Sequence, residues 1–379
     1  MSSLQYSQVQ PDNNKSQFNP LDTVIFTLNN AGRSLVLGSV KLEGKLRVNS
    51  TGTTRATSTQ DIRFNQNAGV ASFIDSVATS TSNQSQLENI SFDYGRWVNM
   101  VAIATTAKSD KCSSKDLCEL KAPINEQTSE FCYGVITENS GAKETRDYDF
   151  SHKLKICLNR PMSGDELPYS KTGFTKISMS LARSVQALFG TFYTDANTNM
   201  SSVNYSMSDL KISYQTVPDM GKAPPVMMRT INPIKSTLES DFSNVSSTVS
   251  GNPCDSVSIC YQELARENNS SYDNQALNSL PQWNSIQYVF NNSNSEYVSY
   301  IVDRKSDAIK YAIEALSMSG HNQLQHDALN NNSVRIDGIS FGEFLDLNSQ
   351  TINVQVSTDG ISTLGTFIIY MFFHSTQSV

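Results

Sequence analysis

The sequence has 379 residues, about twice the usual size of a domain, so we expect two domains that each bury a core. Its 29 Lys and Arg residues against 36 Asp and Glu residues give a formal charge of -7, which argues against a surface that coats nucleic acid. The N-terminus lacks the pattern of a secretory signal, and no apolar run approaches the about 20 residues of a membrane helix. We therefore expect a protein made in the cytosol, with cysteines that are mostly free thiols.

The first half of the chain is predicted to be a series of β-strands behind a polar arm. Residues 1–20 are rich in Gln and Asn and nearly lack apolar periodicity. They predict an N-terminal arm outside any core, either disordered or ordered on a neighbouring subunit or surface. Alternating apolar residues predict strands at 23–28 and 34–48, the second being a strand pair or one strand bent at Gly44. Residues 68–77 predict a further strand.

Residues 86–106 depart from the strand pattern, because their aromatic and aliphatic side chains lie at roughly helical spacing. Residues 108–145 are long, polar and cysteine-bearing, and we interpret them as an insertion beyond the sandwich, with a short strand at 131–137. Strand patterns resume at 148–158 and at 174–181.

The two halves meet at residues 202–225. Apolar residues alternate on both sides of Ser208 and Asp209, but the inward face changes phase between the two runs. This change predicts a β-bulge, or a turn between two short strands. Several prolines and Gly221 follow, and proline donates no backbone hydrogen bond, so strand pairing must end there. We place a linker at 218–235.

The second half contains the clearest helix, at residues 306–319. Its apolar stripe runs through Ile309, Ile313 and Leu316, and we expect this stripe to pack as a lid on the second sandwich. The nearly continuous apolar run at 366–374 predicts a central strand that is covered on both faces. Residues 279–290 are predicted to end in a strand, and further strands are predicted at 333–345 and 351–356.

The two halves share an order of parts. In the first, QLENISFDYGRWVNMVAIA follows a strand, and the half closes on SDLKISYQTV. In the second, SEYVSYIVDRKSDAIKYAIEAL follows a strand, and the half closes on TFIIYMFFHS. Two all-β halves of similar size and similar order indicate a duplication.

With QLENISFDYGRWVNMV, SDLKISYQTV and FIIYMFFHS, and with SLVLGSVKLEGKLRV and ISFGEFLDLNSQTINVQVSTDG, the chain resembles the double jelly-roll major capsid proteins. That family builds the shells of tailless membrane-containing phages, virophages, polinton-like viruses and large eukaryotic DNA viruses. The resemblance implies an all-β fold of two tandem eight-stranded jelly-roll β-sandwiches with short helical excursions. It covers nearly the whole chain, with the first jelly roll at 21–217 and the second at 236–379, and it departs from the family at 108–145.

The resemblance also implies a role. Three chains would form a homotrimeric, pseudo-hexagonal capsomer, because two similar domains in each chain give six similar sides. Such capsomers tile an icosahedral shell, so the implied location is the virion, after synthesis in the host cytoplasm. The implied partners are other copies of the chain, penton proteins and cement or minor capsid proteins, with the N-terminal arm towards the internal membrane. No sequence-specific contact with nucleic acid is implied.

Motifs for catalysis are absent from the sequence, which contains no G-x-S-x-G, no P-loop and no G-x-G-x-x-G. We therefore assign no catalytic, cofactor-binding or metal-ligating residue, no cofactor and no enzymatic activity. The carboxylate pair Asp165 and Glu166 lies in a Gly/Pro turn, where we expect it to be solvated. His321 and His326 follow the helix in a polar segment, where we expect solvated loop residues.

The cysteines leave three alternatives open. Cys112 and Cys118, like Cys254 and Cys260, are separated by more residues than structural zinc motifs use. Free thiols are the favoured interpretation, and local disulfides the next. A metal site is third, and the position of His152 near Cys157 keeps a Cys/His site open.

Two other classes of function fit a pair of β-sandwiches. One is a receptor-binding or glycan-binding protein of the lectin or spike kind, since jelly rolls also serve lectins. The other is an enzyme such as a two-domain hydrolase, which ranks last because no convergent acid–base group is evident. Within the capsid class, a minor double jelly-roll capsid protein is a further alternative.

Overall fold

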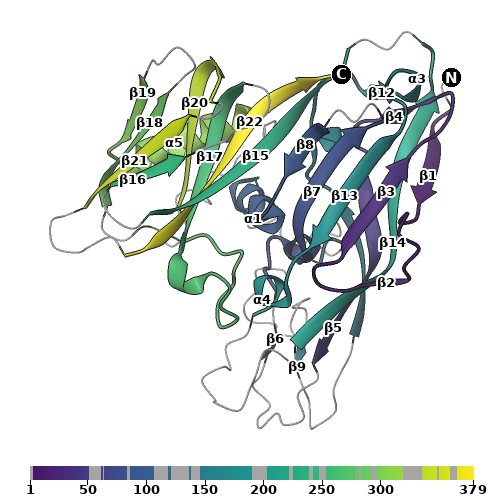
Figure 1. Cartoon of the computed structure of the whole chain (residues 1–379), viewed down its shortest axis with the longest axis horizontal. Coiled ribbons are helices and arrows are strands. Elements are labelled where there is room, and N and C mark those ends of the chain that lie inside the picture. The colour runs from purple at the N-terminus through teal and green to yellow at the C-terminus, as the bar shows by residue number, and fades with distance from the viewer. Residues whose placement is uncertain are drawn as a thin grey trace.

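The computed structural model of the chain places two β-sandwiches side by side (Figure 1). The first, coloured purple to teal, stands at the right of Figure 1, and the second, green to yellow, at the left. The structure describes residues 3–50, 61–62, 64–82, 86–105, 118–120, 136–137, 146–189, 203–221, 225–238, 242–246, 253–278, 280, 283–291, 297–318, 335–347, 350–358 and 365–379. Most of the predicted insertion at 108–145, with most of its predicted strand, lies outside these residues.

The first sandwich is built from β1 (Gln5–Val9), β3 (Thr23–Leu28), β5 (Lys41–Ser50), β7 (Ile74–Thr81), β8 (Gln86–Ile90), β10 (Arg146–Lys153), β13 (Thr175–Leu181) and β14 (Val203–Pro218). One of its sheets has the order β3-β13-β7-β8, and the other contains the order β1-β14-β5-β10. Shorter strands join the second sheet, namely β2 (Gln17–Phe18), β4 (Arg33–Val36) and β12 (Glu166–Pro168). A separate pair is formed by β6 (Asp61–Ile62) and β9 (Ile136–Thr137).

The second sandwich is built from β15 (Met227–Leu238), β16 (Phe242–Ser246), β17 (Cys254–Glu263), β18 (Trp283–Asn291), β19 (Tyr297–Val302), β20 (Ile336–Leu345), β21 (Thr351–Thr358) and β22 (Phe367–Ser378). One sheet has the order β15-β22-β17-β20, with β11 (Pro161–Ser163) of the first half added beside β15. The other sheet has the order β16-β21-β18-β19.

The strand orders of the two sandwiches correspond one to one. The sheet β1-β14-β5-β10 matches β15-β22-β17-β20, and β3-β13-β7-β8 matches β16-β21-β18-β19, with the strands taken in the same chain order. Helix α1 (Tyr94–Thr105) follows β8, and helix α5 (Lys305–Met318) follows the matching β19. The repeated order of parts in the sequence is therefore present in the strand pairing. The remaining helical turns are η1 (Gly69–Phe73), η4 (Cys157–Asn159), α3 (Tyr169–Thr172), α4 (Ser184–Ala187) and η6 (Leu264–Arg266).

A β-bulge interrupts β14 where the sequence predicts a change of phase. The register of its pairing with β5 shifts between Ser208 and Lys211, and Asp209 has a φ of 52°. The partner strand carries Gly44 opposite the bulge, where a Cβ atom would lie 2.9 Å from the Ser208 carbonyl oxygen. The predicted bulge is therefore confirmed, and β14 runs through it as one continuous strand.

Residues 34–48 form neither a strand pair nor one long bent strand. They contain parts of β4 and β5, which both pair with β14 rather than with each other.

The N-terminal segment differs from the expected arm. Strands β1 and β2 pair with β14 of the same chain, and Phe18 is buried in the core of the first sandwich. Residues 5–18 therefore belong to the sandwich rather than to an arm at 1–20. The physical reason is that an edge strand gains backbone hydrogen bonds while most of its side chains stay in solvent. Such a strand needs no apolar periodicity, so its sequence resembles that of a tail.

The strand β22 is covered on both faces, as its sequence predicts. Phe367, Ile369, Met371 and Phe373 point into the core of the second sandwich. Ile368, Tyr370 and Phe372 point the other way and join the core that the first sandwich forms. The corresponding strand of the first sandwich, β14, carries the polar residues Lys211, Ser213 and Gln215 between its core residues. The two sandwiches therefore share one continuous apolar layer along the outer face of the sheet that contains β22.

Helix α5 packs on β20 and β17 of the second sandwich, which confirms the predicted position of the helix. Ala308, Ala312, Ala315 and Leu316 are buried on the side that faces the sheet. A close approach is possible because β20 carries Gly338 beneath the helix. Within the described residues, no helix combines the length and the apolar character that crossing a membrane requires.

We predict that Gly338→Ala lowers the free energy of unfolding by about 1–3 kcal/mol, because overpacking displaces the helix. The added Cβ would lie 2.7 Å from the Ala315 Cβ and 2.9 Å from the Ala312 Cα. Denaturant unfolding monitored by circular dichroism measures the change. Gly365→Ala is the matched control, because its Cβ would meet only Phe367 at 3.7 Å. Equal effects of the two substitutions would contradict the packing described here.

Candidate functional site

Helix α1 lies between the two sandwiches and contacts both. Within the first sandwich it packs on η1 and β7. Towards the second, the Trp97 ring lies 5.3 Å from the Phe372 ring and 5.5 Å from the His374 ring, measured between centroids. All three side chains are buried. Since truncating a buried aromatic residue costs about 3–5 kcal/mol, this single contact contributes substantially to holding the sandwiches together.

Arg96 of α1 adds hydrogen bonds that are specific in direction. Its Nη1 donates to the Ala276 carbonyl oxygen at 2.9 Å, and its Nη2 donates to Gln262 Oε1 at 2.7 Å. The guanidinium also lies 4.0 Å from the centroid of the Tyr370 ring. On the same helix, the Asn99 amide donates to a backbone carbonyl of the second sandwich at 2.6 Å. Because a guanidinium has a fixed fork of donors, these bonds determine the rotation of the helix against the second sandwich.

Glu88 of β8 joins the two sandwiches at a second point. Its buried carboxylate accepts a hydrogen bond from the Ile231 backbone N–H of β15 at 2.7 Å and one from the Cys157 N–H at 2.6 Å. The same carboxylate forms an ion pair with Arg160, which is also buried. A single side chain therefore binds β15 of the second sandwich to a loop of the first.

A second buried ion pair lies next to Arg160. Arg229 Nη1 of β15 lies 2.5 Å from Asp255 Oδ2 of β17, and both side chains are buried. The Arg229 backbone N–H donates to the Arg160 carbonyl oxygen at 3.0 Å. Each of these two buried carboxylates is thus paired with a buried guanidinium. Their arrangement fixes the orientation of β15 against the first sandwich.

The cysteines that the structure describes are free thiols. Cys254 and Cys260 lie on the same strand, β17, but on opposite faces, because the register of the strand shifts between Cys254 and Ser256. Burial raises the pKa of the Cys254 thiol to about 11 and that of Cys260 to about 12. Cys112 lies outside the described residues, so the alternative of a local disulfide with Cys118 stays a prediction.

The other residues singled out by the sequence are not brought together. His152 is buried, with its Nε2 3.1 Å from the Tyr94 hydroxyl oxygen, and Cys157 lies in a separate buried turn. Asp165 is exposed in a turn before β12. His321 and His326 lie outside the described residues. No group of three His, Cys, Asp or Glu side chains suited to a metal ion occurs in the ranges that the structure describes.

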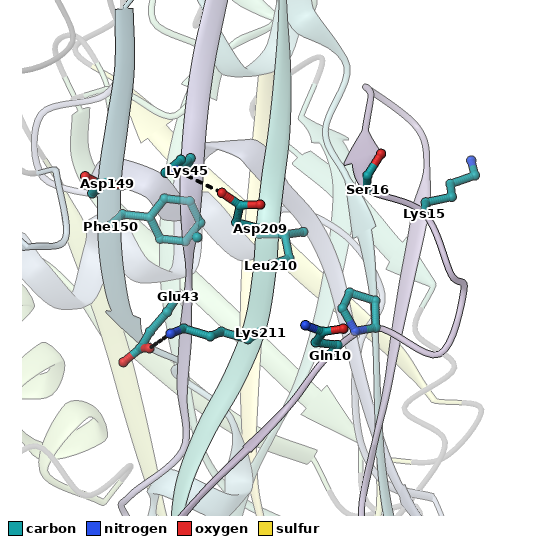
Figure 2. Close-up of a pocket in the computed structure, with 12 residues that line it drawn as sticks. Gln10, Lys15, Ser16, Glu43, Lys45, Asp149, Phe150, Asp209, Leu210 and Lys211 are labelled. Atoms are coloured by element: carbon teal, nitrogen blue, oxygen red, sulfur yellow. Dashed lines mark ion pairs between the residues drawn. The ribbon is translucent and has the colours of Figure 1, made fainter.

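A shallow groove of about 610 Å³ lies on the outer face of the sheet β1-β14-β5-β10 (Figure 2). Figure 2 shows two ion pairs on its floor, Lys45 with Asp209 at 2.9 Å and Lys211 with Glu43 at 3.4 Å. The segment that links β1 to β2 forms its other side. These side chains are paired with each other and partly exposed, so the groove presents a polar surface.

Sequence patterns gave no role to the three buried charges that matter most for the contact, Glu88, Arg96 and Arg160. A usable signal exists, because Glu88 interrupts a short strand and Arg96 interrupts an apolar helix. A charge at such a position must be paired when buried. The sequence does not say with what, since the partners lie on segments far away in the chain.

No protein-family model and no curated protein matches the sequence. Solved structures do match over nearly the full length. The Faustovirus major capsid protein is 8% identical with a TM-score of 0.61, covering 100% of this chain and 90% of that chain. A chain of the Sputnik virophage particle is 11% identical with a TM-score of 0.62, covering 99% and 86%. The mavirus major capsid protein is 8% identical with a TM-score of 0.55, covering 99% and 90%.

At these identities the comparisons show the fold, which is the double jelly roll. The fold that the sequence resemblance implies is therefore confirmed. The comparisons do not establish the number of strands in each jelly roll. Short strands such as β2, β4 and β12 add to the strands that the two sandwiches have in common.

We predict that Glu88→Gln lowers the free energy of unfolding by about 3–5 kcal/mol, because Arg160 then remains buried without its counter-charge. Equilibrium unfolding in urea measures the loss. The matched control is Glu267→Gln, which removes the same charge from a surface pair with Lys235. An exposed pair contributes about 0–1 kcal/mol, so a loss of that size at Glu88 would contradict its role.

We predict that Cys157, Cys254 and Cys260 resist alkylation in the native protein at pH 8. Only the thiolate reacts, and burial both raises the pKa of these thiols and blocks access. Cys118 is exposed and serves as the internal control, because it should be modified rapidly. Peptide mass spectrometry after a timed reaction gives the extent at each cysteine. Rapid modification of Cys260 in the folded protein would contradict the burial of the contact between the sandwiches.

Proposed function

We propose that the chain is a major capsid protein that assembles as homotrimers into pseudo-hexagonal capsomers of an icosahedral shell. The observation that carries this proposal is the pairing of two sandwiches with matching strand orders in one chain. The fold is shared over nearly the whole length with proteins whose names state a major capsid role. Their role is transferred here as a proposal, because the identities are low.

Geometry explains why such a chain suits a shell. Two similar units in each of three chains present six similar sides, and a six-sided block tiles a flat facet. A tile of this kind requires that the two units keep one relative orientation. The contact through α1, Glu88 and Arg96 supports this proposal, since its directional hydrogen bonds form in one relative orientation.

The proposed role is structural and involves no reaction. The partners are first other copies of the chain and then neighbouring capsomers, with penton and cement proteins where the lattice needs them. The proposed location is the virion. A contact with an internal membrane would lie outside β1 and β2, because both strands are part of the first sandwich.

We predict that the purified chain has three times the mass of one chain when measured by light scattering behind a sizing column. Trimers are expected at micromolar concentration, because capsomer contacts bury more than about 1,000 Å². The measurement also separates the alternatives. A monomer at every concentration would contradict the proposal, and binding of that monomer to a glycan array would favour a receptor-binding protein instead.

A further inference from the structure

Residues 264–278 form a loop between β17 and β18 of the second sandwich, and this loop is bound to the first sandwich. At its base, Arg96 of α1 donates a hydrogen bond to the Ala276 carbonyl oxygen at 2.9 Å. Asn99 of α1 donates to the Gln275 carbonyl oxygen at 2.6 Å. In Figure 1 the loop, in green, lies beside α4, whereas both chain termini lie at the top of the view. We call it the 264–278 loop.

Asn274 fixes the shape of this loop. Its side chain is buried, and its amide nitrogen donates to the Val185 carbonyl oxygen of α4 at 2.9 Å. Its amide oxygen accepts a hydrogen bond from the Asn268 backbone N–H at 2.6 Å. The neighbouring Asp273 accepts one from the Asn65 side chain of the first sandwich at 2.7 Å. The backbone of the loop is therefore held in place before a ligand binds, which lowers the entropic cost of binding.

The 264–278 loop presents an aromatic ring to solvent. Tyr272 is 43% exposed, and the Arg266 guanidinium carbon lies 5.0 Å from the centroid of the Tyr272 ring. Arg266 is itself held by Glu263, because the Arg266 Nε lies 2.7 Å from the Glu263 Oε2. Asn268 and Ser271 are exposed in the same loop. The loop therefore combines a supported aromatic ring with an exposed amide and an exposed hydroxyl.

The charged groups next to this ring are already paired within the chain. Arg266 pairs with Glu263, and Glu267 pairs with Lys235 of β15 at 3.1 Å. An anionic or a cationic ligand is attracted by uncompensated charge, which this surface does not supply. Its ring, amide and hydroxyl instead suit a ligand that is uncharged, that carries many hydroxyl groups and that has an apolar face.

We propose that the 264–278 loop is a binding site for neutral saccharides. The apolar face of a pyranose ring packs on the Tyr272 ring, and the sugar hydroxyls exchange hydrogen bonds with Asn268 and Ser271. Tyr, Ser and Asn also dominate the recognition loops of antibodies, because they combine rigid contact area with adaptable hydrogen bonds. This binding activity goes beyond the proposed structural role, and it requires no second copy of the chain.

The first test is a glycan array probed with the purified full-length chain. We expect binding to neutral oligosaccharides, and we expect Tyr272→Ala to raise their dissociation constants at least tenfold because the stacking surface is lost. Tyr272→Phe keeps the ring and should retain binding. Tyr6→Ala is the matched control, because Tyr6 is an exposed tyrosine on β1 of the other sandwich. Binding that survives Tyr272→Ala, or that is confined to sialylated or sulfated glycans, would overturn the proposal.

The second test locates the saccharide on the native protein. Hydrogen–deuterium exchange is compared with and without the neutral oligosaccharide that binds best on the array. We expect slower exchange in peptides that cover residues 264–278 and unchanged exchange in peptides that cover β1 and β14. Protection of another segment instead, or an array without any binding, would overturn this inference. Light scattering gives the mass of the same sample, so trimers that bind no glycan would leave the proposed function standing.

Discussion

The structure depends on one sheet that is buried on both faces. The strand β22 sends alternate side chains into two different cores, one inside the second sandwich and one shared with the first. A sheet in this position cannot be exposed without placing a row of aromatic and aliphatic side chains in water, at a cost of about 1.5–3 kcal/mol for each. The two sandwiches are therefore held together by a shared core, although each has a complete set of strands.

Apolar burial alone would hold the sandwiches together without defining their angle. The buried charges define the angle between the two sandwiches. Glu88 binds the edge of β15, and Arg96 binds carbonyl groups of the second sandwich, each with near-ideal distances. Buried ion pairs contribute little net stability, but a misaligned contact would leave a charge unpaired at a cost of several kcal/mol. Other relative orientations of the two sandwiches are thus disfavoured, because each would leave a buried charge unpaired. In the proposed capsomer, the angle between the two sandwiches would therefore be the same in every chain.

Some elements of the fold were predictable from the sequence and others were not. The bulge at Ser208 and Asp209, helix α5 and the double-sided β22 were predictable, because each leaves a local signature of phase, stripe or unbroken apolar run. The edge strand β1 was not, since its polar side chains match those of a disordered tail and only its backbone is bound. The partners of Glu88 were not either, because Ile231 and Arg160 lie far from it in the sequence. The cores follow from local patterns, whereas the contact between the units is a property of the folded chain.

Electron cryo-microscopy of the purified assembly, reconstructed without imposed symmetry, tests the central claim most directly. The claim is that the two sandwiches of each chain keep one fixed relation and alternate around a common axis. The account predicts a six-lobed particle in which three lobes match the first sandwich and three the second, with the same angle within every chain. Particles in which the two lobes of a chain adopt variable angles, or in which chains remain single, would contradict it.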